Sequence, residues 1–147
     1  MSKKVRLRRG KSLLFVCYGN TCSSPMAEGL ARRRLGTSVS LGSAGLSPYH
    51  FGAQREAVRV MEELFGVDIS GHVTRSLSEI ELEEFDWIFV LDGFVYEHLR
   101  RHLPEIRSRL VAWPIDDPFG QNLEAYRDSG KTLARLFDKK LIPPAST

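Results

Sequence analysis

Short apolar runs alternate with amphipathic segments along the chain. Four runs are nearly free of charge, as expected of strands that are buried on both faces of a sheet; they cover residues 12–16, 39–45, 87–91 and 110–113. Between them, apolar residues recur at helical spacing in segments 25–35, 52–65, 92–103 and 123–137. Leu77, Ile80 and Leu82 predict a further short helix.

Strands that alternate with helices predict the α/β class. We expect one three-layer domain with a four-stranded parallel sheet, helices on both faces and a functional loop after the first strand. The 147 residues are 42% hydrophobic and 27% charged, which suits a single globular domain. We place this domain at residues 12–140, with a basic tail at 1–11 and a loose tail at 141–147.

The hydrophobic stretches and the net charge of the chain limit the cellular locations and the partners that we expect. No apolar stretch approaches the ~20 residues of a membrane helix, and no apolar run of a signal peptide follows the basic N-terminus. We therefore expect a cytoplasmic protein without a membrane partner. The net charge of +3 suits anionic substrates but does not call for nucleic acid. The sequence leaves the oligomeric state open.

Cysteine and histidine usage argues against a disulfide framework and against a metal cofactor. Both cysteines lie within one short segment, and the histidines lack zinc-ligand spacing; they are His50, His72, His98 and His102. We expect no cofactor.

The segment Cys17–Pro25 holds the candidate chemistry. It follows an apolar strand and leads into an amphipathic helix, so its backbone N–H groups and the helix N-terminus converge on one small anion site. Such donors also stabilise a thiolate. Cys17 is therefore predicted to be a nucleophile of low pKa, and the loop from Tyr18 to Ser24 is predicted to bind a phosphate-like group.

This segment resembles the signature of the low-molecular-weight protein tyrosine phosphatases, Cys-x-Gly-Asn-x-Cys-Arg-Ser-Pro. The chain departs from it at Ser23, where the family has arginine, and matches at Cys17, Gly19, Asn20, Cys22, Ser24 and Pro25. Later segments resemble the family in the same order: Ser43-Ala44-Gly45, His72 with Arg75, Leu91-Asp92, and Asp117-Pro118.

The resemblance implies hydrolysis of a phosphorylated protein or a small phosphomonoester through a cysteinyl-phosphate intermediate. It implies that Cys17 is the nucleophile and Asp117 the general acid, with Asp116 as the rival acid. It also implies that Asn20 braces the loop, that Ser24 bonds to the thiolate, and that His72 supports Asn20. The phosphate-binding residues would be Tyr18, Gly19, Asn20, Thr21, Cys22, Ser23 and Ser24.

Ser23 separates three functional hypotheses, because a missing arginine should cost about 10³ to 10⁵ in rate. The first is an impaired phosphatase, or one rescued by Arg55 or Arg75. The second is a pseudophosphatase that binds phosphoproteins or anions without turnover. The third is a thiol redox sensor in which Cys17 and Cys22 form a disulfide.

The substrate is indicated less sharply. In having threonine at position 21, the loop resembles that of the protein arginine phosphatases. The aromatic residues Phe119, Tyr18 and Tyr49 would instead offer walls for a phenyl ring. Both phosphotyrosine-type and phosphoarginine substrates stay open.

Overall fold

The computed structural model describes residues 3–145 and contains the expected parallel sheet. Its strand order is β3-β2-β4-β5, with β2 at Ser12–Cys17, β3 at Ser40–Gly45, β4 at Trp87–Val90 and β5 at Leu110–Ala112. Along β2, Leu13 and Phe15 pack into one core, while Leu14 and Val16 pack into another. Both faces of this strand are therefore buried, which explains its uninterrupted apolar run.

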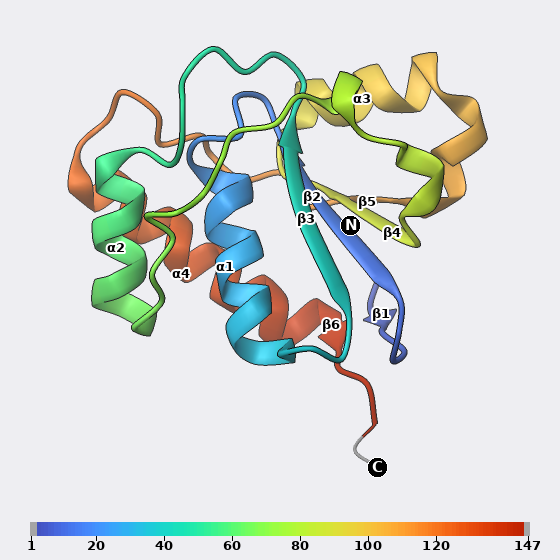
Figure 1. Cartoon of the computed structure of the whole chain (residues 1–147), viewed down its shortest axis with the longest axis horizontal. Coiled ribbons are helices and arrows are strands. Elements are labelled where there is room, and N and C mark those ends of the chain that lie inside the picture. The colour runs from blue at the N-terminus through green and yellow to red at the C-terminus, as the bar shows by residue number, and fades with distance from the viewer. Residues whose placement is uncertain (1–2, 146–147) are drawn as a thin grey trace.

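Helices cover both faces of the sheet (Figure 1). On one side lie α1 (Ser23–Leu35), α2 (Arg55–Phe65) and α4 (Leu123–Lys140). On the other side lie α3 and three short 3₁₀ helices; these are α3 (Gly93–His102), η1 (Leu77–Glu79), η2 (Leu82–Glu84) and η3 (Pro104–Arg109). The α/β class and the four parallel strands are as predicted.

Two helical segments differ from the expectation in detail. The helix predicted from residue 52 begins at Arg55, because Gly52 adopts a φ of +69° and Gln54 is extended. The helix predicted around Leu77–Leu82 is instead two separate 3₁₀ turns, since Ile80 and Glu81 are both extended.

The two ends of the chain are not the loose tails that the sequence suggested. Val5–Arg6 forms β1 and Leu141–Ile142 forms β6, and these strands pair in parallel. Val5 and Leu7 are 1% and 2% exposed, because alternate side chains of an extended segment point to opposite sides. The expectation of tails at 1–11 and 141–147 is therefore corrected for the described part of both segments; residues 1, 2, 146 and 147 lie outside it.

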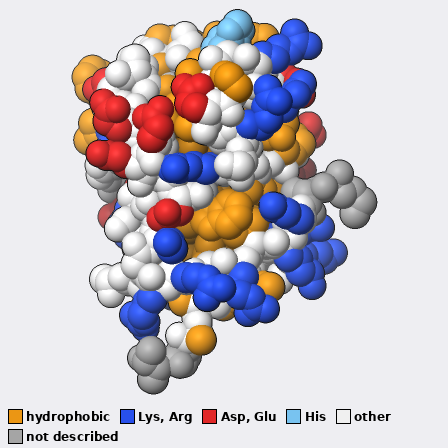
Figure 2. All heavy atoms as spheres, turned by 90° about the vertical axis from the view of Figure 1, so that its right-hand side faces the viewer, with side chains coloured by type: hydrophobic (Ala, Val, Ile, Leu, Met, Phe, Trp, Pro, Cys, Tyr) orange, Lys and Arg blue, Asp and Glu red, His pale blue; other side chains and the backbone are white. Residues whose placement is uncertain are grey.

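This ordering places three basic residues of the N-terminal segment around one surface hollow. Arg6, Arg8 and Lys11 line a hollow with Asp86 and Trp87. Figure 2 shows Lys and Arg side chains around an apolar patch on this side of the molecule. No helix between residues 3 and 145 is long and apolar enough to cross a membrane.

Candidate active site

The loop between β2 and α1 lies at the carboxyl edge of the sheet, where ligands of parallel α/β sheets bind. Cys17 is the last residue of β2, and α1 begins at Ser23. Between them, Asn20 is fully buried and has a φ of +56°. Asparagine tolerates this left-handed conformation better than most residues. The tight turn therefore depends on the residue type at position 20.

The side-chain amide of Asn20 makes three hydrogen bonds. Its Nδ2 donates to Ser24 Oγ at 2.8 Å and to Ser43 Oγ at 3.0 Å. Its Oδ1 accepts the backbone N–H of Arg75 at 2.8 Å. Both amide hydrogens and the amide oxygen are thus engaged, so the side chain braces the loop as expected.

The thiol of Cys17 receives two bonds. Its Sγ lies 3.0 Å from Ser24 Oγ and accepts the backbone N–H of Asn20 at 3.2 Å. Ser24 Oγ already accepts a hydrogen from Asn20, so its own hydrogen is available for the sulfur. Both bonds then point toward Cys17 and favour its thiolate form.

His72 and Glu28 support the loop from behind. His72 Nε2 lies 2.9 Å from the carbonyl oxygen of Asn20; a carbonyl only accepts, so this nitrogen carries the hydrogen. Ser43 donates to Glu28 Oε1 at 2.6 Å. His72 was predicted from the sequence, whereas Glu28 was not. The position of Glu28 four residues after Ser24, on the same face of α1, was the available signal.

Gly45 at the end of β3 is a further residue whose role the sequence did not reveal. A Cβ at this position would lie 2.8 Å from the carbonyl oxygen of Tyr18 and 2.9 Å from the backbone nitrogen of Asn20. Side-chain atoms do not fit at such distances from backbone. The loop therefore packs directly against this glycine.

A small cavity of about 40 Å³ opens above the thiol. The loop contributes Cys17, Tyr18, Gly19, Thr21 and Cys22 to its walls, and the remaining walls are Tyr49, His50, Asp117 and Phe119. The other predicted phosphate-binding residues are Asn20, Ser23 and Ser24; all three are buried and do not line this cavity.

Asp117, and not Asp116, faces the thiol. Asp117 lines the cavity with Cys17, and its Oδ1 accepts the backbone N–H of Phe119 at 3.0 Å. Asp116 does not line this cavity; the bond that it accepts, from Ser129 Oγ at 3.3 Å, goes to its backbone carbonyl oxygen. The structure thus brings together the thiol and the carboxylate that were paired from the sequence.

Aromatic rings surround the mouth of the cavity. The His50 ring lies 5.3 Å from that of Phe119 and 4.6 Å from that of Tyr49. On another side, Tyr18 lies 6.5 Å from Phe94. These rings form walls that suit a flat group attached to a phosphate.

Known proteins are similar to this chain in both sequence and fold. The sequence pattern of the family "Low molecular weight phosphotyrosine protein phosphatase" matches residues 12–139. The chain belongs to this family. It is 35% identical over 136 residues to the "Probable low molecular weight protein-tyrosine-phosphatase EpsP" of Ralstonia nicotianae, covering 87% of this chain and 92% of that protein.

Two solved structures illustrate the range of relatives. The low molecular weight protein tyrosine phosphatase from T. tengcongensis superimposes with a TM-score of 0.79 at 34% identity, covering 88% of this chain and 97% of that one. The YwlE arginine phosphatase from Geobacillus stearothermophilus gives a TM-score of 0.78 at 26% identity, covering 87% of this chain and 88% of that one.

The position at which the family signature predicts arginine holds Ser23, which is 3% exposed. Within the described part of the chain, no Lys or Arg lines the cavity, and His50 is its one basic side chain. Arg55 and Arg75, considered from the sequence as replacement cations, do not line it. The terminal nitrogen of Arg75 lies instead over Gly42.

The expectation of a low pKa at Cys17 is not met. Burial raises the pKa of Cys17 above its usual value, and the charge of Asp117 adds to this, although the bonds from Ser24 and Asn20 act in the opposite direction. Among residues 3–145, no Lys or Arg lines the cavity, so no cationic side chain adds to these two bonds in offsetting the cost of burying a charged sulfur.

Cys22 also has a raised pKa, at about 11, because it is buried. Its sulfur lies 3.4 Å from the hydroxyl of Tyr126, and both cysteines are free thiols. Among residues 3–145, no group of three or more His, Cys, Asp or Glu side chains is placed to hold a metal ion.

Proposed function

We propose that this member of the family hydrolyses protein phosphomonoesters of the phosphotyrosine type through a cysteinyl-phosphate intermediate, and does so slowly. The observation that supports this most is that Cys17 and Asp117 line one cavity. A nucleophile and a proton donor on the same small space are the two groups that this reaction needs.

In the first step, the thiolate form of Cys17 attacks the phosphorus through Sγ, and the bond from phosphorus to the leaving oxygen breaks. Asp117, in its protonated form, gives its proton to that oxygen. Ser24 donates to the sulfur at 3.0 Å and steadies it as the nucleophile. The backbone N–H groups from Tyr18 to Ser24 would receive the phosphoryl oxygens at the start of α1.

In the second step, water attacks the phosphorus and the bond from sulfur to phosphorus breaks. Asp117, now a carboxylate, takes a proton from this water. The sulfur leaves as a thiolate, which the same bond from Ser24 stabilises. The products are inorganic phosphate and the regenerated thiol site.

Ser23 is the reason for a slow reaction. An arginine that forks two N–H groups onto the transferring phosphoryl contributes about 10³ to 10⁵ in rate, or roughly 4 to 7 kcal/mol of transition-state stabilisation. Serine is too short and carries no charge, and the raised pKa of Cys17 further reduces the thiolate population. Backbone donors remain, so anion binding persists.

The aromatic walls support a phosphotyrosine-type substrate. The rings of Tyr49, His50 and Phe119 lie tilted against one another at the cavity mouth, where a phenyl ring would contact them. Phosphoarginine is the alternative, which the resemblance at Thr21 and the fold shared with an arginine phosphatase support. We propose the cytoplasm as the location, because free thiols in the loop persist in a reducing compartment.

Two other functions stay as alternatives. A pseudophosphatase would bind phosphoproteins at the same backbone donors without turnover. A redox sensor would join Cys17 and Cys22; the engagement of Cys22 with Tyr126 argues for a structural role of this thiol instead.

The deciding experiment is Ser23→Arg, assayed with 4-nitrophenyl phosphate. If the scaffold lacks only its arginine, hydrolysis should rise by about 100-fold or more. The gain should vanish when Cys17→Ser is added. A wild type that already hydrolyses at rates typical of phosphatases would rule out impairment, and a folded but inert Ser23→Arg variant would favour the binding module.

A further inference from the structure

A second and much larger cavity lies beside the phosphate loop, on the far side of Asn20. Its volume is about 560 Å³, within the range of small-molecule sites. It is bounded by α1, by Ser43 on β3, and by residues from the segment 67–75. In Figure 1 these residues run from the end of α2 across α1 to the upper end of β3.

The floor of this cavity is apolar. Gly29 on α1 receives Ile69, whose Cγ2 lies 2.6 Å from the place where a Cβ would be, so the crossing segment is anchored at this point. Val67 and Val73 extend the apolar lining, and Val73 is 64% exposed. A ligand with an apolar body would cover this surface.

The rim is cationic. Arg33 makes only a long contact of 3.4 Å to the carbonyl oxygen of Gly66, and Arg32 pairs with Glu28 at 2.8 Å while remaining 61% exposed. Asp68 is turned toward the backbone N–H of Ser70 at 2.8 Å. Two guanidinium groups therefore remain accessible, and such groups fork onto carboxylate, sulfonate or phosphate oxygens.

Four residues that line this cavity connect to the phosphate loop through Asn20. The backbone N–H of Arg75 donates to Asn20 Oδ1 at 2.8 Å. His72 bonds to the Asn20 carbonyl oxygen at 2.9 Å. Glu28 accepts from Ser43, which in turn accepts from Asn20 Nδ2 at 3.0 Å. Since the backbone N–H of Asn20 also donates to Cys17 Sγ, one residue separates the second cavity from the nucleophile.

We propose that this cavity is a second ligand site, for a small organic anion with an apolar body, and that its occupancy changes the affinity of the phosphate loop for anions. An anion on Arg32 and Arg33 competes with Glu28 for Arg32, and Glu28 transmits the change through Ser43 to Asn20. The coupling rests on the proposed anion binding at the loop, whereas ligand binding in the cavity does not.

The probe for the site is 1-anilinonaphthalene-8-sulfonate, which has an aromatic body, one sulfonate and a fluorescence that rises on binding. Wild type should bind one equivalent. Arg33→Glu should weaken binding by about tenfold or more, since it replaces one of the two guanidinium groups of the rim with a carboxylate. Gly71→Leu should do the same by filling the space, because Gly71 lines the cavity and a Cβ added there would meet no atom within 4 Å.

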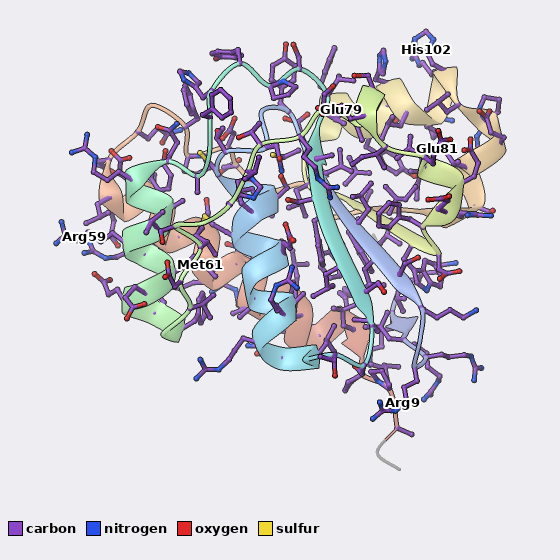
Figure 3. All side chains as sticks on the ribbon, viewed as in Figure 1. Arg9, Arg59, Met61, Glu79, Glu81 and His102 are labelled. Carbon is purple, nitrogen blue, oxygen red and sulfur yellow. The ribbon has the colours of Figure 1, made fainter. Side chains whose placement is uncertain are left out.

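The matched control is Arg59→Glu, because Arg59 projects from α2 away from the body of the protein (Figure 3). This variant should bind the probe as wild type does, and circular dichroism checks that all variants are folded. No binding to wild type would overturn the site. Binding that orthovanadate abolishes and that Arg33→Glu leaves unchanged would also overturn it, because the probe would then sit at the phosphate loop.

Coupling is tested by titrating orthovanadate with and without saturating probe. We expect a change of about threefold or more in its affinity, the same factor in the reverse titration, and no change in Arg33→Glu. Equal affinities would overturn the coupling. Failure of orthovanadate to bind the free protein would instead count against the proposed function, while the probe titrations would still test the cavity.

Discussion

The amide Nδ2 of Asn20 donates a 2.8 Å hydrogen bond to Ser24 Oγ, and this bond fixes where Ser24 can send its own hydrogen. The nearest remaining acceptor is Cys17 Sγ at 3.0 Å. Ser24→Ala should therefore raise the pKa of Cys17 further. A bond to a charged group contributes about 1.5–3 kcal/mol, which is roughly one to two pKa units.

The measurement is the rate of alkylation by iodoacetamide against pH, in a Cys22→Ala background so that one thiol reacts. Its midpoint should move to higher pH in Ser24→Ala and stay in place in Ser40→Ala, which alters an exposed serine at the start of β3. An unmoved midpoint in Ser24→Ala would show that another group donates to the sulfur.

Asp117 and Asp116 should differ as general acids, since one of them lines the cavity with Cys17. In the Ser23→Arg background, Asp117→Asn should slow the hydrolysis of phenyl phosphate by about 100-fold or more, because this leaving group needs a proton. Asp116→Asn should change the rate by less than about threefold. The opposite ranking would transfer the role to Asp116.

The raised pKa of Cys22, about 11, predicts a loss of stability in alkali. Below about pH 9 both states of the chain keep the thiol proton; above it the unfolded chain loses the proton and the folded chain keeps it. The free energy of unfolding should thus fall, by about 1.4 kcal/mol for this one thiol at pH 10.

Urea unfolding at pH 8, 9 and 10 under reducing conditions measures this loss. Burial raises the pKa of Cys17 in the same direction, so the Cys22→Ala variant should lose less stability than wild type but not become independent of pH. Equal losses in the two proteins would mean that Cys22 titrates normally when folded.

The pairing of β1 with β6 predicts that the N-terminal segment stabilises the fold. Leu7 is 2% exposed, so Leu7→Ala should lower the free energy of unfolding by about 2–4 kcal/mol. Arg8→Ala, at the exposed neighbouring position, should change it by less than about 0.5 kcal/mol. Equal stability of the two variants would mean that this segment frays in solution.

The main sheet and the phosphate loop could be predicted from the sequence because their signals are local. Each central strand is an apolar run, and the loop from Cys17 to Ser24 is a contiguous motif. Asp117 was predicted from the resemblance of Asp117-Pro118 to the family, with Asp116 as the rival.

The rest depends on contacts between distant segments. β1 and β6 have two residues each and come from opposite ends of the chain, so neither has a periodic pattern to detect. The position of His50 beside Phe119 depends on how two loops meet. The pKa of Cys17 depends on its burial, which the donors around the loop do not reveal.

The parallel pairing of Val5 with Leu141 also brings β1 and β6 together. These two strands lie at the edge of the protein opposite the phosphate loop. A short flexible linker could therefore join the two ends, and new ends could be opened elsewhere, because permutation is tolerated where termini are close. Cleavage at the exposed turn around Gly120 would give a permuted protein whose nucleophile and α1 keep their places. Fusions placed before β1 or after β6 would likewise leave the mouth of the cavity unobstructed.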